Sequence, residues 1–342
     1  MVTMRTNVQM AWTTRITALM CLTGFGLFAM AIWPVAAGPN PDLVVGPNAC
    51  AECHKKEAEI WQKTHHFTTF RDLPNDKDAD TIADKMGVKR LKSESLCLNC
   101  HFTVQAPDKV IAGVSCESCH SGAKDWNKLH SGFSGKKEGE ETKAEIAARW
   151  EKSEAAGMIR PGNYYALAKN CFTCHVVPNE KLVNVGGHTA GSAFELVSWS
   201  QGEVRHNTWY TKGASNPEAP LPRKRMLFVV GRVVELEVSL RGVGVATAKD
   251  NYALKMAKRA DDARKAVTAL AKLLPSAPEL QQISDLANAA ELKLNNQAAL
   301  DDTADKISVL AMKFSSGYDG SAFGAIDQYL PGPDKFKGTV SN

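Results

Sequence analysis

The sequence Cys97-Leu98-Asn99-Cys100-His101 is followed, after fourteen residues, by Cys116-Glu117-Ser118-Cys119-His120. Both segments have the form Cys-x-x-Cys-His, which is the attachment motif of c-type haem. On a helix the two cysteines lie one turn apart, so both can bond to one porphyrin while the adjacent histidine reaches its iron. The same motif occurs at residues 50–54 and 171–175. The chain is therefore expected to bind four covalently attached haem c groups.

Paired cysteines would also suit a zinc site or a disulfide framework. Histidine accounts for only 9 of 342 residues, yet one stands directly after each of the four cysteine pairs. The attachment rule explains all four of these histidines, so haem is the preferred interpretation. It assigns eight cysteines to cofactor binding: Cys50, Cys53, Cys97, Cys100, Cys116, Cys119, Cys171 and Cys174.

The composition indicates a soluble globular protein that is not directed at nucleic acid. Hydrophobic residues make up 44% of the chain and charged residues 23%, which is ordinary for such proteins. The formal net charge of +4 is small, and the sequence contains no dense basic stripe of the kind that binds a phosphate backbone.

The first 37 residues have the pattern of a secretory signal peptide. Arg5 and Arg15 precede an apolar run at 18–32, and the small residues at 35–37 suit cleavage near Ala37. An uncleaved anchor is the alternative, because an apolar segment of about 20 residues spans a bilayer. We expect an exported protein, in the periplasm or on the outer surface, with a membrane-anchored form if the segment is retained.

The remaining chain is expected to be mainly α-helical and to form two domains. Residues 38–216 carry all four motifs and predict a loop-rich multihaem cytochrome c domain with short helices. Two of these are expected at about 53–70 and 140–156, with a solvated charged loop at 135–141 before the second. A proline-rich break at 217–222 marks the predicted boundary.

Residues 217–342 contain neither cysteine nor histidine and favour helix. One long helix is expected from about 223 to 274, weakened at Gly242-Val243-Gly244, followed by shorter helices to about 314. We expect a helical hairpin or small bundle that serves oligomerisation or docking.

The histidines outside the motifs are candidates for the sixth ligand of each iron. Four histidines are proximal ligands by motif: His54, His101, His120 and His175. Five others remain, all within the predicted haem domain: His65, His66, His130, His188 and His206. Two imidazoles give a saturated, low-spin iron suited to electron transfer, whereas an open sixth position can bind a substrate. Five candidates are enough for four fully coordinated haems.

Two stretches resemble a known family. One is Cys50-Ala51-Glu52-Cys53-His54 with Trp61 and Thr64 before His66. The other is Gly113-Val114-Ser115-Cys116-Glu117-Ser118-Cys119-His120, which His130 follows. Both resemble the tetrahaem cytochrome c-552/c-554 family of nitrifying bacteria, in motif order and local spacing, over about residues 46–210.

The resemblance implies that the distal ligands are exchanged crosswise between haems. It pairs His54 with His130, His120 with His66, and His175 with His206. The family's second haem has an open position, whereas this sequence has a histidine in Gly186-Gly187-His188. His188 either closes the haem of His101 or only packs nearby.

We predict an exported tetrahaem electron carrier, not an enzyme, with redox proteins as donors and acceptors and no catalytic residues. The first alternative is an enzyme that acts on hydroxylamine or nitric oxide at an open haem of His101. The second is a structural role, in which the C-terminal helices join subunits or dock on a membrane complex.

Overall fold

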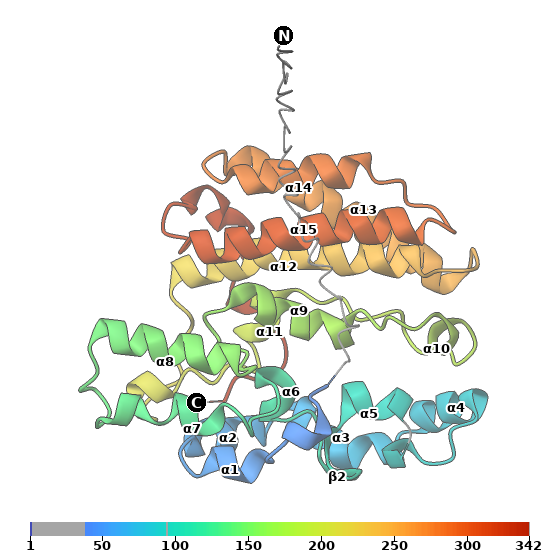
Figure 1. The fold of residues 1–342 in the computed structure, drawn as a ribbon. Coiled ribbons are helices and arrows are strands. Elements are labelled where there is room, and N and C mark those ends of the chain that lie inside the picture. The colour runs from blue at the N-terminus through green and yellow to red at the C-terminus, as the bar shows by residue number, and fades with distance from the viewer. Residues whose placement is uncertain (2–37, 94, 342) are drawn as a thin grey trace. The chain divides into compact units, whose positions relative to one another are not determined.

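The computed structural model describes residue 1, residues 38–93 and residues 95–341. The predicted signal peptide therefore lies outside the described residues. The described residues from 38 onward belong to one compact unit, and the expected mainly α fold class is confirmed (Figure 1). Within the described ranges, no helix is both long enough and apolar enough to cross a membrane.

The predicted haem domain consists of short helices, one small sheet and connecting loops. Its helices are α1 (Pro47–Ala51), α2 (Lys55–Trp61), α3 (His65–Asp72), α4 (Lys77–Met86), α5 (Ser95–His101), α6 (Cys116–His120), α7 (Asn127–His130), α8 (Lys143–Ala155), α9 (Tyr164–His175), α10 (Glu180–Asn184) and α11 (Leu196–Ser200). Short 3-10 turns are η1 (Pro41–Leu43), η2 (Leu73–Asn75), η3 (Leu91–Ser93), η4 (Phe133–Gly135) and η5 (Trp209–Thr211).

The single helix expected at 53–70 is two helices, α2 and α3. The break falls at Thr64, which has an extended backbone and accepts a hydrogen bond from the Phe67 amide at 3.2 Å. A threonine that satisfies a free amide in this way starts a new helix. The new helix gives His65 and His66 a direction of their own.

The β-hairpin lies between the second and third motifs. Strands β1 (Thr103–Gln105) and β2 (Lys109–Ala112) are antiparallel and pair Val104 with Val110, with an irregular register next to Thr103. The buried Thr103 hydroxyl contacts the Ser115 and Ser118 hydroxyls at 2.9 and 3.0 Å. The hairpin therefore fixes the start of α6, which carries the third motif.

The C-terminal part is a bundle of four helices: α12 (Leu221–Gly244), α13 (Asn251–Leu273), α14 (Pro278–Ala289) and α15 (Gln297–Gly317). Two 3-10 segments follow, η6 (Gly324–Tyr329) and η7 (Pro333–Lys335). Helix α12 is buried on nearly all sides, because α13 and α15 pack on one side and α9 and α11 on the other (Figure 1). Phe172 and Val176, at the end of α9, belong to the same hydrophobic core as Val233 and Leu236 of α12.

The long helix expected at 223–274 is wrong, because the chain ends α12 at Gly244 and folds back as α13. A Cβ atom on Gly242 would lie 2.9 Å from the Met256 sulfur, and one on Gly244 would lie 3.2 Å from Gln297. The glycines allow α13 and α15 to approach α12 closely. Asp250 then caps α13 by accepting from the Asn251 amide.

Candidate haem centres

Each Cys-x-x-Cys-His motif lies on a short helix or at a helix end. The second and third motifs fill α5 and α6, and the fourth occupies the last turn of α9. The first begins on α1 and ends at His54, immediately before α2. In the second, third and fourth motifs one helical turn presents both cysteines, whereas in the first Cys50 lies on α1 and Cys53 lies in the turn that follows it.

The structure places each motif histidine opposite a second histidine. A bond between a metal and an imidazole nitrogen is about 2 Å long, so two rings that share one ion from opposite sides have centroids about 6 Å apart. The ring centroids are separated by 6.3 Å for His54 and His130, 6.2 Å for His175 and His66, 6.3 Å for His101 and His188, and 6.3 Å for His120 and His206. All four pairs therefore have the spacing of two imidazoles on one iron.

Of the three pairings that the resemblance implied, the structure brings one together and separates the other two, and it places His188 next to His101, one of the two alternatives left open for it. His130 faces His54 as the resemblance implied, and His188 faces His101 directly. His66 lies opposite His175 rather than His120, while His206 lies opposite His120.

The exchange has a local cause, because the third and fourth motifs are neighbours in space. The Asn170 side-chain amide, next to the fourth motif, donates to the Ser118 carbonyl of the third at 2.8 Å. Helices α6 and α9 are also in contact. Sequence spacing therefore does not determine which of the two motifs a distant histidine will face.

His65 has a different environment from the paired histidines. Its side chain is 85% exposed, and its Nδ1 lies 2.7 Å from a carboxylate oxygen of the buried Glu203. Among the described residues it is the one histidine that does not face a motif histidine. Of the five candidate distal ligands, His65 is therefore the one that remains after the four pairs have formed.

The Nδ1 atoms of the paired histidines are held by the surrounding chain. A backbone carbonyl accepts from Nδ1 in four cases: His120 to Ile159 at 2.9 Å, His130 to Asn127 at 2.6 Å, His188 to Thr189 at 2.8 Å and His206 to Val204 at 2.6 Å. A carbonyl accepts only from a protonated nitrogen, so the lone pair of the neutral ring lies on Nε2. Metal-bound histidines are typically oriented in this way.

Burial favours the neutral form of the His101, His120 and His175 rings. Desolvation, followed by neighbouring groups, lowers the pKa of His101, His120 and His175 to about 4. A neutral imidazole is the form that binds a metal. These three side chains are therefore competent ligands at neutral pH.

Two comparisons with known proteins find similar sequences. Residues 49–121 match the model of the family described as cytochrome c554 and c-prime. Cytochrome c-554 of Nitrosomonas europaea is 26% identical over 167 residues, which cover 44% of this chain and 66% of that protein. The chain is similar to the cytochrome c-554 family. The resemblance predicted from the motifs is thereby confirmed.

The similarity to cytochrome c-554 supports covalently bound haem c with iron at the motifs. The family match includes the first three motifs, whereas the fourth, at 171–175, lies beyond it. The alignment with cytochrome c-554 covers 66% of the Nitrosomonas protein, just under two thirds of its length. No solved structure matches the chain.

Buried nitrogen atoms near the histidine pairs indicate that haem fits this part of the structure. The indole nitrogens of Trp126 and Trp199 and the Nε atom of Arg205 are buried without a hydrogen-bond partner. The Trp126 ring lies 5.1 Å from His130, and the Trp199 ring lies 6.1 Å from His175. Buried donors without acceptors are costly, and haem propionates are acceptors of suitable charge.

A metal ion could also be bound directly by clustered side chains. The described residues contain no group of three or more His, Cys, Asp or Glu that could hold an ion.

Sequence analysis did not identify Trp126 or Arg205 as residues near the haem sites. No motif distinguishes these two residues from other buried aromatic or basic side chains.

Contacts between cysteines give the spatial order of the four attachment sites. The Cys50 side chain lies close to that of Cys116, and the Cys100 side chain lies close to that of Cys174. Because the third and fourth motifs are also neighbours, the order is 50–54, 116–120, 171–175 and 97–101. The two ends of this series are the first and second motifs of the sequence.

Gly113 allows β2 to approach α3 closely. A Cβ atom at this position would lie 2.4 Å from the His66 carbonyl oxygen, and the Val114 amide already donates to that oxygen at 3.0 Å. Gly113→Ala should displace α3 and lower the free energy of unfolding by about 1–3 kcal/mol, measured by chemical denaturation. Gly317→Ala is the control, because a Cβ there would meet nothing within 4 Å. Equal stability of Gly113→Ala and the parent protein would contradict the expected clash.

Proposed function

We propose that this protein is an exported tetrahaem c-type cytochrome that carries electrons between redox partners. The observation that carries the proposal is the set of four histidine pairs, each with ring centroids 6.2 or 6.3 Å apart. Haem iron, when bound, supplies one-electron redox chemistry whose potential depends on its axial ligands and surroundings. The protein's contribution is to attach, coordinate and order the four groups.

Each site draws on three kinds of residue. The two motif cysteines would form the thioethers, and the motif histidine and its partner histidine would bind the iron. The proposed iron ligands are His54 with His130, His101 with His188, His120 with His206, and His175 with His66. Two imidazoles on each iron leave no coordination position for a substrate, which favours electron transfer over the enzyme alternative.

The spatial order of the sites supports transfer along a line. The two ends of the line are the site of His54 and the site of His101. Their motifs are consecutive in the sequence, but the sites of His120 and His175 lie between them in space. We propose that donor and acceptor proteins exchange electrons at these two ends. The α12–α15 bundle is a further candidate for self-association or docking, since Val309 and Met312 are exposed one turn apart on α15.

The haem count and the spin state of the holoprotein test the proposal. Protein produced with c-type haem attachment should have the mass of the polypeptide plus four haem c groups. Its ferric electron paramagnetic resonance spectrum should be entirely low-spin, because every iron has two imidazole ligands. A mass corresponding to fewer haems, or a high-spin signal that responds to nitric oxide, would contradict the proposal.

A further inference from the structure

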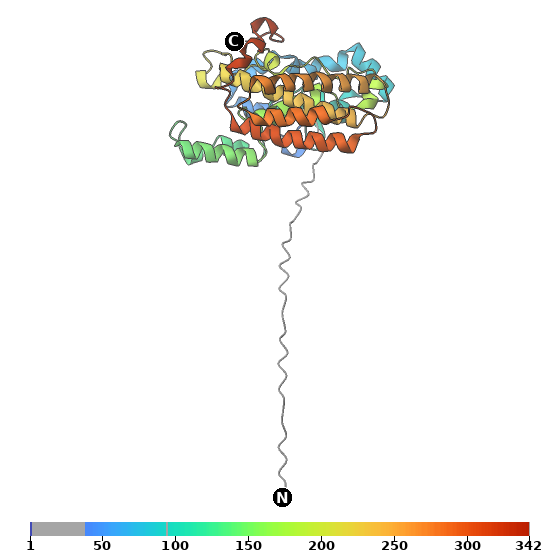
Figure 2. The ribbon, with the colours of Figure 1, turned by 90° about the horizontal axis from the view of Figure 1, so that it is seen from above.

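Residues 131–159 form an excursion that starts directly after one iron-ligand candidate, His130, and ends in contact with another, His120. It leaves directly after His130 and turns through η4 into α8. It then returns to Ile159, whose amide donates to the His120 carbonyl at 3.0 Å and whose carbonyl contacts His120 Nδ1 at 2.9 Å. Figure 2 shows this segment, in green, projecting from the other helices. The excursion was expected to be a solvated loop and a helix, yet both of its ends contact the histidine pairs.

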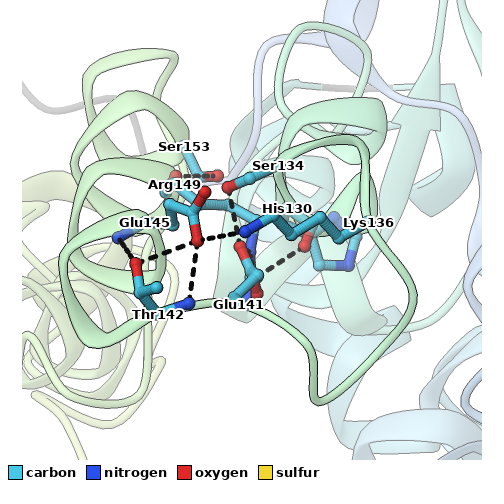
Figure 3. A network of polar contacts seen from close by, with 8 residues as sticks. All are labelled: His130, Ser134, Lys136, Glu141, Thr142, Glu145, Arg149 and Ser153. Carbon is cyan, nitrogen blue, oxygen red and sulfur yellow. Dashed lines mark hydrogen bonds and ion pairs between the residues drawn. The ribbon is translucent and has the colours of Figure 1, made fainter.

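Arg149 of α8 reaches back to the residue at which the excursion starts. Its Nη1 donates to the His130 carbonyl oxygen at 2.7 Å (Figure 3). Its Nε and Nη2 atoms bind both carboxylate oxygens of Glu141, at 2.7 to 3.0 Å. A bidentate pair of this kind fixes the plane of the guanidinium group.

The Arg149–Glu141 pair is enclosed rather than solvated. Only 9% of the Arg149 side chain and 3% of the Glu141 side chain are exposed. The Arg149 guanidinium carbon lies 4.5 Å from the Trp150 ring centroid and 5.1 Å from that of Phe133. Ser134 donates a further hydrogen bond to Glu141 at 2.8 Å. Removing either partner of an enclosed pair would leave the other charge without compensation, which is costly.

His130 needs external support because it ends a helix of a single turn. Helix α7 has only four residues, and so short a helix is not stable by itself. The chain leaves it through Phe133 and Ser134, both in the left-handed region with φ of 43° and 54°. The His130 ring is bonded through Nδ1 to Asn127 in the same turn, so unwinding of the turn would move the ring.

We propose that Arg149, held in place by Glu141, is a positioning residue that keeps His130 opposite His54. This inference rests on the proposed ligation of iron by His130. Arg149 acts on the backbone of the ligand residue, through its hydrogen bond to the His130 carbonyl oxygen. The same excursion holds His120 through Ile159, so one segment supports ligands of two neighbouring sites.

Ferric spin state and carbon monoxide binding by the reduced holoprotein test this role. His130→Ala should produce the high-spin signal of one haem and bind one equivalent of carbon monoxide. Arg149→Gln should produce the same signal at partial intensity and shift the midpoint potential of that haem alone. Arg149→Lys should give a smaller effect, because lysine keeps the charge but lacks the bidentate geometry. Glu141→Gln should also give a partial signal.

The control is Arg160→Gln, since Arg160 also contacts Trp150 but pairs with Glu154 and does not reach His130. It should remain low-spin. A high-spin His130→Ala together with fully low-spin Arg149→Gln and Glu141→Gln would overturn the positioning role and leave the proposed function intact. A low-spin His130→Ala would instead contradict the ligation on which both rest. A signal of equal size in Arg160→Gln would show a general effect of the segment and also overturn the role of Arg149.

Discussion

Replacing His188 by alanine is expected to convert the haem of His101 from low-spin to high-spin. The His188 ring centroid lies 6.3 Å from that of His101, and no other histidine in the described chain is unpaired and near enough to replace it, since His65 is bound to Glu203. The opened iron should then bind nitric oxide, which the parent protein should not. Electron paramagnetic resonance with and without nitric oxide measures both effects.

The local backbone supports this expectation. Gly187 has a φ of 82°, in the left-handed region that favours glycine, and the His188 amide donates to the Leu182 carbonyl at 3.2 Å. The Gly-Gly-His sequence thus turns the chain at the end of α10 and presents the ring. His65→Ala is the control and should leave the spectrum unchanged. An unchanged spectrum in His188→Ala would refute the assignment of His188 as the sixth ligand.

The attachment sites could be predicted from the sequence because their chemistry is local. Two thiols one turn apart and an adjacent imidazole need only a short helix, and short helices carry or flank all four motifs. The candidates for the distal ligands could also be predicted, since four of the five remaining histidines face a motif histidine.

The pairing of distal ligands could not be predicted, because it depends on packing between distant segments. Thr64 starts α3 as a separate helix, and Gly113 brings β2 against it. The cap at Thr64 and the close approach of Gly113, a residue distant in sequence, together set the direction of His66. Nothing in the spacing of His66 or His206 from the motifs contains that information.

Two local environments differ from what the sequence predicts. Residues 135–140 are exposed, as expected of a solvated loop, but the last residue of the run, Glu141, is enclosed with Arg149. The break at Gly242-Val243-Gly244 was expected to weaken a helix, whereas it ends one and allows the next to pack closely. In both cases the decisive partner lies on another element, so local composition gives the wrong environment.

Replacing Glu237 by alanine is expected to cause the largest loss of stability among these variants. Glu237 lies on α12 with a fully buried side chain. It forms an ion pair with Lys169 of α9, accepts from the Tyr165 hydroxyl at 2.9 Å and pairs with Arg241 at 3.1 Å. Removal would leave Lys169, whose side chain is 20% exposed, without this counter-charge. Breaking a buried pair in this way costs about 3–5 kcal/mol.

The loss should extend to the fourth haem site, because Lys169 and Tyr165 belong to the helix that ends in the motif at 171–175. Chemical denaturation followed by circular dichroism gives the change in stability, and the absorption of the holoprotein reports on the haem environment. Glu291→Ala is the matched control, since Glu291 pairs with Lys293 on the surface with 69% of its side chain exposed, and exposed pairs contribute little. Glu237→Gln should fall between the two, because the amide retains an acceptor for Tyr165 but not the charge. Equal stability of Glu237→Ala and Glu291→Ala would contradict a stabilising role of the buried ion pair between the C-terminal bundle and α9. The apolar contacts of Phe172 and Val176 would then have to account for the stability of that interface.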